Sequence, residues 1–89
     1  MALIHKYTLQ GGNNLIQLPA TAQVLSVKFQ RSRPCMWVKL DPKEKTVERE
    51  FLMVGTGEFI TNYGKLDFID TILTANHMYV FHIFEKLEA

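Results

Sequence analysis

Three histidines and one cysteine are the residues of this chain best suited to metal binding or nucleophilic chemistry. They are His5, His77, His82 and Cys35, and zinc sites are built from these residue types. Their spacing does not match a zinc site, because the sequence contains neither a C-x-x-C nor an H-x-x-x-H pattern. We expect His82 to be a core histidine with a hydrogen-bonded ring, and His77 to be solvated in a turn. Cys35 lies in an apolar run and is expected to pack as an inert thiol. No metal or cofactor site is predicted.

Two short stretches have the composition of an anion site. Arg31 and Arg33 carry guanidinium groups that can hold phosphate or carboxylate through two hydrogen bonds. Residues two apart in an extended segment point to the same side, and Arg33 precedes a proline, so we expect the two groups to converge. The Gly55–Gly57 turn can present backbone N–H groups to an anion, although it lacks the phosphate-loop pattern. The predicted ligand- or partner-binding residues are Arg31, Arg33, Gly55, Thr56 and Gly57.

Catalysis has little support in the sequence. No serine or threonine stands in a nucleophile-elbow context, and the acidic residues are scattered without a convergent acid–base pair. Trp37, the only tryptophan, suits either a stacking platform for a ligand or a packing centre. In a core this small we expect it to be a buried packing centre. The sequence therefore predicts a protein that is not an enzyme.

Length and charge narrow the class of protein. A chain of 89 residues forms one domain, here residues 1–89. The formal net charge of +1 argues against a specific nucleic-acid binder, which usually carries a clear positive excess. A single cysteine cannot form an internal disulfide, which favours a reducing cytoplasm. No stretch approaches the ~18–20 apolar residues of a membrane span, and residues 1–7 lack a signal-peptide pattern.

The segment from Gln23 to Asp41 has the pattern of a β-hairpin. Residues 23–30 alternate apolar and polar side chains, as a strand with one buried face does. An R-S-R-P connection follows, and residues 35–38 are apolar on both faces, as in a strand covered on both sides. We expect this hairpin to be the centre of the domain.

Turn residues divide the rest of the chain into further strands. We predict strands at Leu3–Leu9, Leu15–Leu18, Thr46–Val54, Leu66–Thr74 and Met78–Leu87. The last should lie within a sheet, because both its faces are apolar through Phe84, whereas Leu66–Leu73 also fits a helix. Residues 58–64 are expected to form a loop or a single helical turn. The predicted fold is all-β, a small antiparallel β-sandwich or barrel of six to seven strands.

Three stretches together resemble a family of small uncharacterised proteins that is widespread in bacteriophage genomes and prophages. They are P-C-M-W-V-K-L-D-P (34–42), E-R-E-F-L-M-V-G-T-G-E-F-I (48–60) and M-Y-V-F-H-I-F-E (78–85). They are similar to that family's P-x-x-W hairpin strand, G-T-G turn and terminal V-x-H-V-F-E strand, and the opening H-K-Y strand is similar too. The resemblance implies a phage origin and a compact β fold, and it transfers no activity.

These observations favour a non-enzymatic phage accessory protein that acts by binding in the cytoplasm of the infected bacterial host. Its expected partner is a host protein, such as a component of antiviral defence. The first alternative is an oligomeric protein that sequesters a small anionic ligand, such as a nucleotide signal, with Arg31, Arg33, Trp37 and the glycine turn. The second alternative is a minor structural component of the virion.

Overall fold

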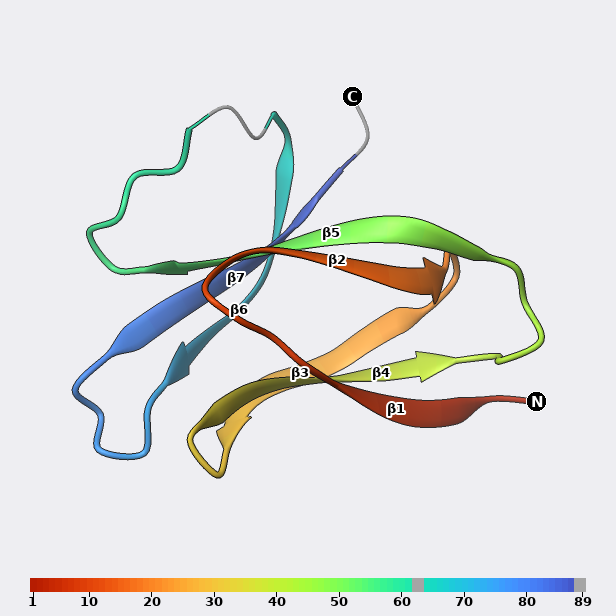
Figure 1. Ribbon diagram of the computed structural model, residues 1–89, viewed down its shortest axis with the longest axis horizontal. Coiled ribbons are helices and arrows are strands. Elements are labelled where there is room, and N and C mark those ends of the chain that lie inside the picture. The colour runs from red at the N-terminus through yellow and green to blue at the C-terminus, as the bar shows by residue number, and fades with distance from the viewer. Residues whose placement is uncertain (62–63, 88–89) are drawn as a thin grey trace.

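The computed structural model describes residues 1–61 and 64–87, and it folds them into two antiparallel sheets that face each other (Figure 1). No helix occurs in these two ranges. The seven strands are β1 (Leu3–Thr8), β2 (Gly12–Pro19), β3 (Gln23–Gln30), β4 (Arg33–Leu40), β5 (Thr46–Gly55), β6 (Leu66–Leu73) and β7 (Val80–Lys86). The predicted all-β sandwich is thus confirmed, with the strand count at seven.

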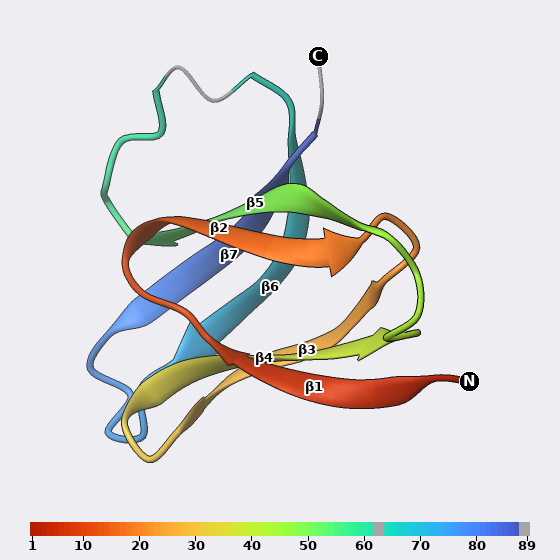
Figure 2. The same cartoon turned by 45° about the vertical axis from the view of Figure 1, so that its right-hand side comes forward.

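The strands divide between the sheets out of sequence order. Sheet A has the order β1-β4-β3, and sheet B has the order β2-β5-β7-β6. The chain crosses from sheet A to sheet B after β1 and returns after β2 (Figure 2). At the first corner the Leu9 N–H donates to the Pro34 carbonyl over 2.8 Å, and the Asn14 side chain accepts from the Gln10 N–H over 2.9 Å. Gly12, with φ at 85°, allows the reversal that the glycine–asparagine cluster indicates.

The core lies between the sheets and takes alternate residues from each strand. Sheet A contributes Val27, Met36 and Val38, and sheet B contributes Phe51 and Ile83; each of these side chains is fully buried. Such a side chain stabilises the fold by about 1.5–3 kcal/mol relative to full exposure. The alternation fixes which face of each strand points away from the core, although Leu52 and Val54 on the outer side of β5 are buried as well.

The two long edges of the sandwich differ. Strands β3 and β6 pack against each other at one edge, and each carries a bulge, at Val24/Ser26 in β3 and at Phe68/Asp70 in β6. At the opposite edge β1 and β2 diverge from their shared corner, as both views show (Figures 1 and 2). The sandwich is therefore closed on one side and open on the other.

Strand boundaries depart from the prediction by two or more residues at three places. β4 begins at Arg33, so Arg33 and Pro34 belong to the strand and not to the expected R-S-R-P connection. β2 is longer than expected and runs from Gly12 to Pro19, because Pro19 occupies its last position, where a missing N–H is tolerated. The last strand begins at Val80, so Met78 and Tyr79 are exposed turn residues. Leu66–Leu73 is a strand rather than a helix, and β7 lies within sheet B as predicted. Part of the loop predicted over 58–64, residues 62 and 63, lies outside the described residues.

Candidate functional site

Positive charge gathers on the solvent side of sheet A. Residues 1–40 contain five Lys or Arg residues and no Asp or Glu, whereas all nine acidic residues lie beyond Leu40. Met36 and Val38 point into the core, so Trp37 and Lys39 lie on the opposite side of β4. We call this outward side of sheet A the basic face. Its charged members are Lys6, Lys28, Arg33 and Lys39.

The register spreads these cations over all three strands of sheet A. Residues paired across antiparallel strands share a face, so Lys6 lies beside Trp37, and Lys28 lies beside Cys35. The Lys6 ammonium donates to the Gln30 side-chain carbonyl over 2.7 Å. Within residues 1–61 and 64–87, no ion pair neutralises a cation of the basic face. These charges therefore remain available to a partner.

Trp37 lies at the middle of the basic face rather than in the core. Its strand neighbours Met36 and Val38 are fully buried, so the indole occupies the opposite side, between Lys6 of β1 and Ser26 of β3. The side chain is partly buried there. The expectation that Trp37 is the packing centre is wrong, because three consecutive apolar residues in β4 hide which of them faces inward. A partly buried indole with Lys6 opposite it and Lys39 two residues along the same strand is suited to contact another molecule.

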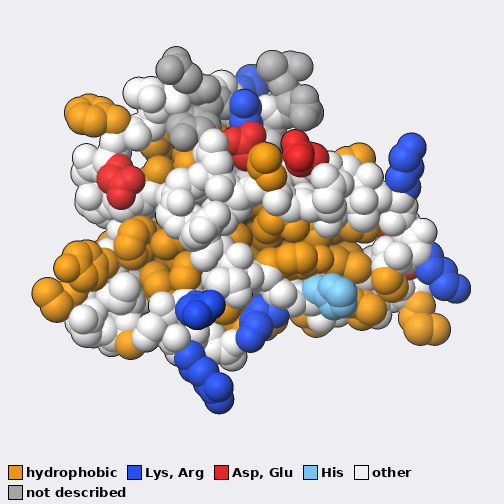
Figure 3. Space-filling model, in the orientation of Figure 1, with side chains coloured by type: hydrophobic (Ala, Val, Ile, Leu, Met, Phe, Trp, Pro, Cys, Tyr) orange, Lys and Arg blue, Asp and Glu red, His pale blue; other side chains and the backbone are white. Residues whose placement is uncertain are grey.

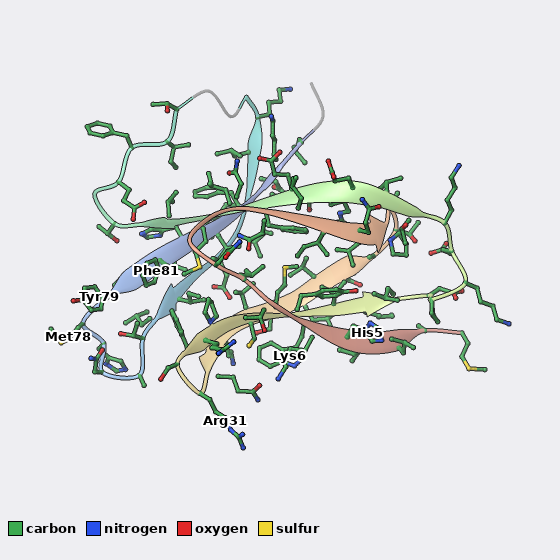
Figure 4. All side chains as sticks on the ribbon, in the orientation of Figure 1. His5, Lys6, Arg31, Met78, Tyr79 and Phe81 are labelled. Atoms are coloured by element: carbon green, nitrogen blue, oxygen red, sulfur yellow. The ribbon has the colours of Figure 1, made fainter. Side chains whose placement is uncertain are left out.

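The two arginines at the tip of the β3–β4 hairpin are placed differently from each other. Arg31 and Ser32 have φ of 51° and 68°, and the flanking Gln30 and Arg33 pair with each other. This is a two-residue turn of the primed type, in which both central residues are left-handed. Arg31 therefore projects from the tip (Figure 4), whereas Arg33 lies in the strand on the basic face. The predicted extended geometry, with both guanidinium groups on one side, is wrong.

The Gly55–Gly57 turn lies at the end of β5 in sheet B. The Thr56 N–H donates to the Val80 carbonyl over 3.1 Å, so this amide is not free to bind an anion. Gly57 has φ at 93°, the left-handed conformation that explains a glycine there. The structure thus places the turn and Arg33 on different sheets, and it does not bring the two halves of the predicted site together.

His82 belongs to a polar cluster on the outer side of sheet B. Its Nε2 lies 2.8 Å from the Thr56 Oγ1, and its Nδ1 lies 3.0 Å from the Thr71 Oγ1. Its ring is hydrogen-bonded as predicted, but the placement in the core is wrong. Sequence reasoning missed this cluster because its partners are 26 and 11 residues away. A hydroxyl as the orienting group supplies no charge to stabilise an imidazolium, so we assign the cluster a structural role. His77 is an exposed turn residue, as expected.

A cleft of about 710 Å³ lies beside Arg49 at the end of sheet B. The Arg49 Nε and Nη2 donate to the two carboxylate oxygens of Glu85 over 2.6 and 2.8 Å. Its Nη1 donates to the carbonyls of Pro19 and Ala22 over 3.1 and 2.8 Å. Both charged side chains are 15% exposed, and hydrogen bonding to Glu85 raises the pKa of Arg49. The guanidinium is therefore a clamp that fixes the β2–β3 connection onto sheet B.

Cys35 carries a free, buried thiol beneath the basic face, and its Sγ lies 3.5 Å from the Arg33 carbonyl oxygen. This burial agrees with a packing role. Among the described residues, no group of three His, Cys, Asp or Glu side chains is arranged to hold a metal ion. The described part of the chain also contains no helix that could span a membrane.

The unpaired cations of sheet A are concentrated at one margin of the molecule. In the space-filling view a group of blue side chains lies at the lower margin, and other blue side chains lie at the upper and right margins (Figure 3). In comparisons with known proteins, the profile of a family described as "Domain of unknown function (DUF7352)" matches residues 1–89. The search of curated proteins found no match, and the search of solved structures found none either.

Proposed function

The chain belongs to the DUF7352 family over residues 1–89, and we propose from the geometry of its surface that it is a non-enzymatic protein that binds an acidic surface of another protein. The observation that carries this proposal is the basic face, where four cations surround Trp37 without an acidic residue among them. A face of one charge sign raises the rate of encounter with a partner of the opposite sign. A central aromatic side chain within a polar rim is the usual anatomy of a binding hot spot.

The distribution of charge favours a protein partner over a nucleic acid. The net charge is only +1, because the nine acidic residues lie beyond Leu40. Proteins that bind single strands combine a positive groove with several aromatic side chains that stack on successive bases. The basic face offers one aromatic side chain, Trp37, which is partly buried. A locally acidic protein surface matches such a limited basic face better than a long polyanion does.

The biological setting follows from the motif resemblance. We propose that the protein is a phage accessory protein, that it acts in the bacterial host cell, and that the acidic surface belongs to a host protein such as a defence component. A small-ligand site is less favoured, because Arg33 and Thr56 lie on different sheets. The Thr56 amide, which an anion would need, is already bonded within the fold.

Binding of a fluorescent polyglutamate peptide, followed by anisotropy at low and high salt, tests the proposal. We expect binding that weakens with salt and that falls about tenfold or more in Lys28→Glu/Lys39→Glu. The matched control is Lys65→Glu/Lys86→Glu, which changes the net charge equally but lies away from sheet A: Lys65 directly precedes β6, and Lys86 is the last residue of β7. An equal loss in the control would show that net charge alone governs binding.

A labelled oligothymidylate in the same assay addresses the class of partner. We expect it to bind more weakly than the peptide at matched salt, because one partly buried indole provides little stacking. Tighter binding of the oligonucleotide, lost in Lys28→Glu/Lys39→Glu, would contradict the proposal and assign the basic face to nucleic acid.

A further inference from the structure

One strand edge of this fold lacks the features that prevent strand pairing. The free edges belong to β1 and β3 in sheet A and to β2 and β6 in sheet B. β3 and β6 are bulged and pack against each other, and β2 ends at Pro19. β1 is Leu-Ile-His-Lys-Tyr-Thr, with no proline or glycine, and its pairs with β4 run without a register shift. Apart from Lys6, nothing in β1 opposes the addition of another strand.

The surface around this edge is apolar. Figure 3 shows hydrophobic side chains in a band between β1 and β2, and His5, labelled in Figure 4, lies within it. On the side of β1 that carries His5, Leu3 is 37% exposed, and Tyr7 and Ile16 of β2 are only partly buried. A contiguous exposed apolar region with unpaired backbone groups is typical of an interaction surface.

We propose that β1 pairs antiparallel with β1 of a second copy of this chain, about a two-fold axis through His5. A two-fold axis perpendicular to the sheet keeps the basic face of both copies on the same side. Odd-numbered residues of β1 can then be opposite only odd-numbered residues of the second copy, and even-numbered residues only even-numbered ones. An axis through Lys6 would place the Lys6 side chains of the two copies directly opposite each other, and like charges in this position destabilise strand pairing. An axis through Ile4 would engage only the first half of β1.

The register centred on His5 makes β1 complementary to itself. Leu3 is then opposite Tyr7 of the second copy, and Ile4 is opposite Lys6, so each lysine has an apolar neighbour whose surface its methylene stem can cover. Residues 3–7 all pair. The self-complementary pattern specifies a second copy rather than an unrelated strand, which would meet two exposed apolar residues and a lysine without matched partners.

This pairing joins the two copies of sheet A into one continuous sheet of six strands, in the order β3-β4-β1-β1-β4-β3. The two basic faces become one surface with twice the number of free cations, and the apolar band is covered. The inference stands on the β1 edge alone. It rests on the proposed function only where it assigns the doubled basic face to an acidic partner.

Sedimentation equilibrium over a range of concentrations tests the association. We expect a mass that rises toward twice the 10.3 kDa of the chain. Ile4→Lys should give monomers, because it places two pairs of lysines opposite each other. Leu25→Lys is the matched control, because Leu25 is an exposed apolar residue of β3, and it should still dimerise. A wild-type chain that stays monomeric up to millimolar concentration would overturn the proposal.

Cysteine cross-linking tests the register in a Cys35→Ala background. In His5→Cys the two thiols face each other with Cα atoms about 4.5–5.5 Å apart, within the range that a disulfide spans. In Ile4→Cys they are displaced by about 7 Å along the strand, beyond that range. We expect a covalent dimer from His5→Cys only. Cross-linking of Ile4→Cys without cross-linking of His5→Cys would overturn the two-fold axis at His5.

The monomeric Ile4→Lys variant separates this inference from the proposed function. It retains every cation of the basic face and adds one, so its matched reference is the dimeric Leu25→Lys variant, which adds the same charge. It should still bind the polyglutamate peptide, with at least about tenfold lower affinity than Leu25→Lys because two linked faces bind together. Equal affinities of monomer and dimer would contradict the shared surface. Loss of the dimer alone leaves the basic face as the site of the single chain.

Discussion

The lysines of the basic face and Arg49 of sheet B use positive charge in opposite ways. Lys28 and Lys39 are exposed, and among the described residues they form no ion pair. Arg49 makes four hydrogen bonds, two of them to Glu85, and is 15% exposed. A half-buried cation must have its donors satisfied, whereas an exposed cation keeps its water shell until a partner replaces it. The difference assigns stability to the corner of sheet B and leaves the outer side of sheet A as the proposed recognition surface.

The largest expected effect is on the sheet B side of this comparison. Arg49→Ala should lower the free energy of unfolding by about 2–4 kcal/mol, because it leaves Glu85 and two backbone carbonyls without their donor. Urea unfolding followed by circular dichroism measures the change. A loss below about 1 kcal/mol, the level of a surface ion pair, would show that the clamp contributes no more than an exposed pair.

Trp37→Ala tests the basic face at its centre. We expect a smaller loss of about 1–2 kcal/mol, because the indole is already partly in contact with water and its removal opens no closed cavity. The same variant should bind the polyglutamate peptide markedly more weakly. Unfolding midpoints and anisotropy together measure the two effects. A destabilisation of about 3–5 kcal/mol, typical of a truncated core aromatic, would make Trp37 a packing residue after all.

The hairpin tip provides a gain of stability without touching the charges in the strands. Arg31→Asn/Ser32→Gly should stabilise the fold by about 1 kcal/mol, because asparagine and glycine adopt the left-handed conformations of this turn at lower cost. Thermal melting measures it. Ser32→Ala serves as the control, since alanine is no better than serine at positive φ. A lower melting temperature in the double variant would show that Arg31 or Ser32 makes a stabilising contact.

The smallest expected change in stability is that from removing two exposed lysines of the basic face. Lys28→Ala/Lys39→Ala should change the free energy of unfolding by no more than about 0.5 kcal/mol, since exposed charges contribute little to stability. Chemical unfolding measures this change on the same scale as Arg49→Ala. A loss equal to that of Arg49→Ala would remove the distinction between the two uses of charge.

Local patterns predicted the strands well, because alternation and turn residues are local properties of the sequence. The β3–β4 hairpin was predictable from them, whereas Leu66–Leu73 also fitted a helix and is resolved only by its pairing with β7. Placement relative to the core was harder. Trp37 stands within an apolar run, where either face of β4 could be buried, and His82 finds its partners through pairings far apart in sequence.

The candidate site was only partly predictable. Arg33 was expected to bind an anionic partner together with Arg31; it lies on the basic face, whereas Arg31 does not, and the binding stays a prediction. The other cations of that face come from three strands, so only the strand order brings them together. One sequence signal was available, since no acidic residue precedes Asp41. That signal indicates a charge asymmetry but not which side of a sheet displays it.

The division of the strands between the sheets also sets the order in which the molecule assembles. β3 and β4 form a hairpin with a two-residue turn, whereas β1 pairs with β4 through residues as far apart as Leu3 and Leu40. Local hairpins close in microseconds, but pairings that close long loops carry a larger entropic cost and form late. The sequence separations therefore favour an order in which the hairpin forms first and β1 pairs with it later. In that order Lys6 reaches Trp37 only at a late step, so the basic face is complete only in the folded chain.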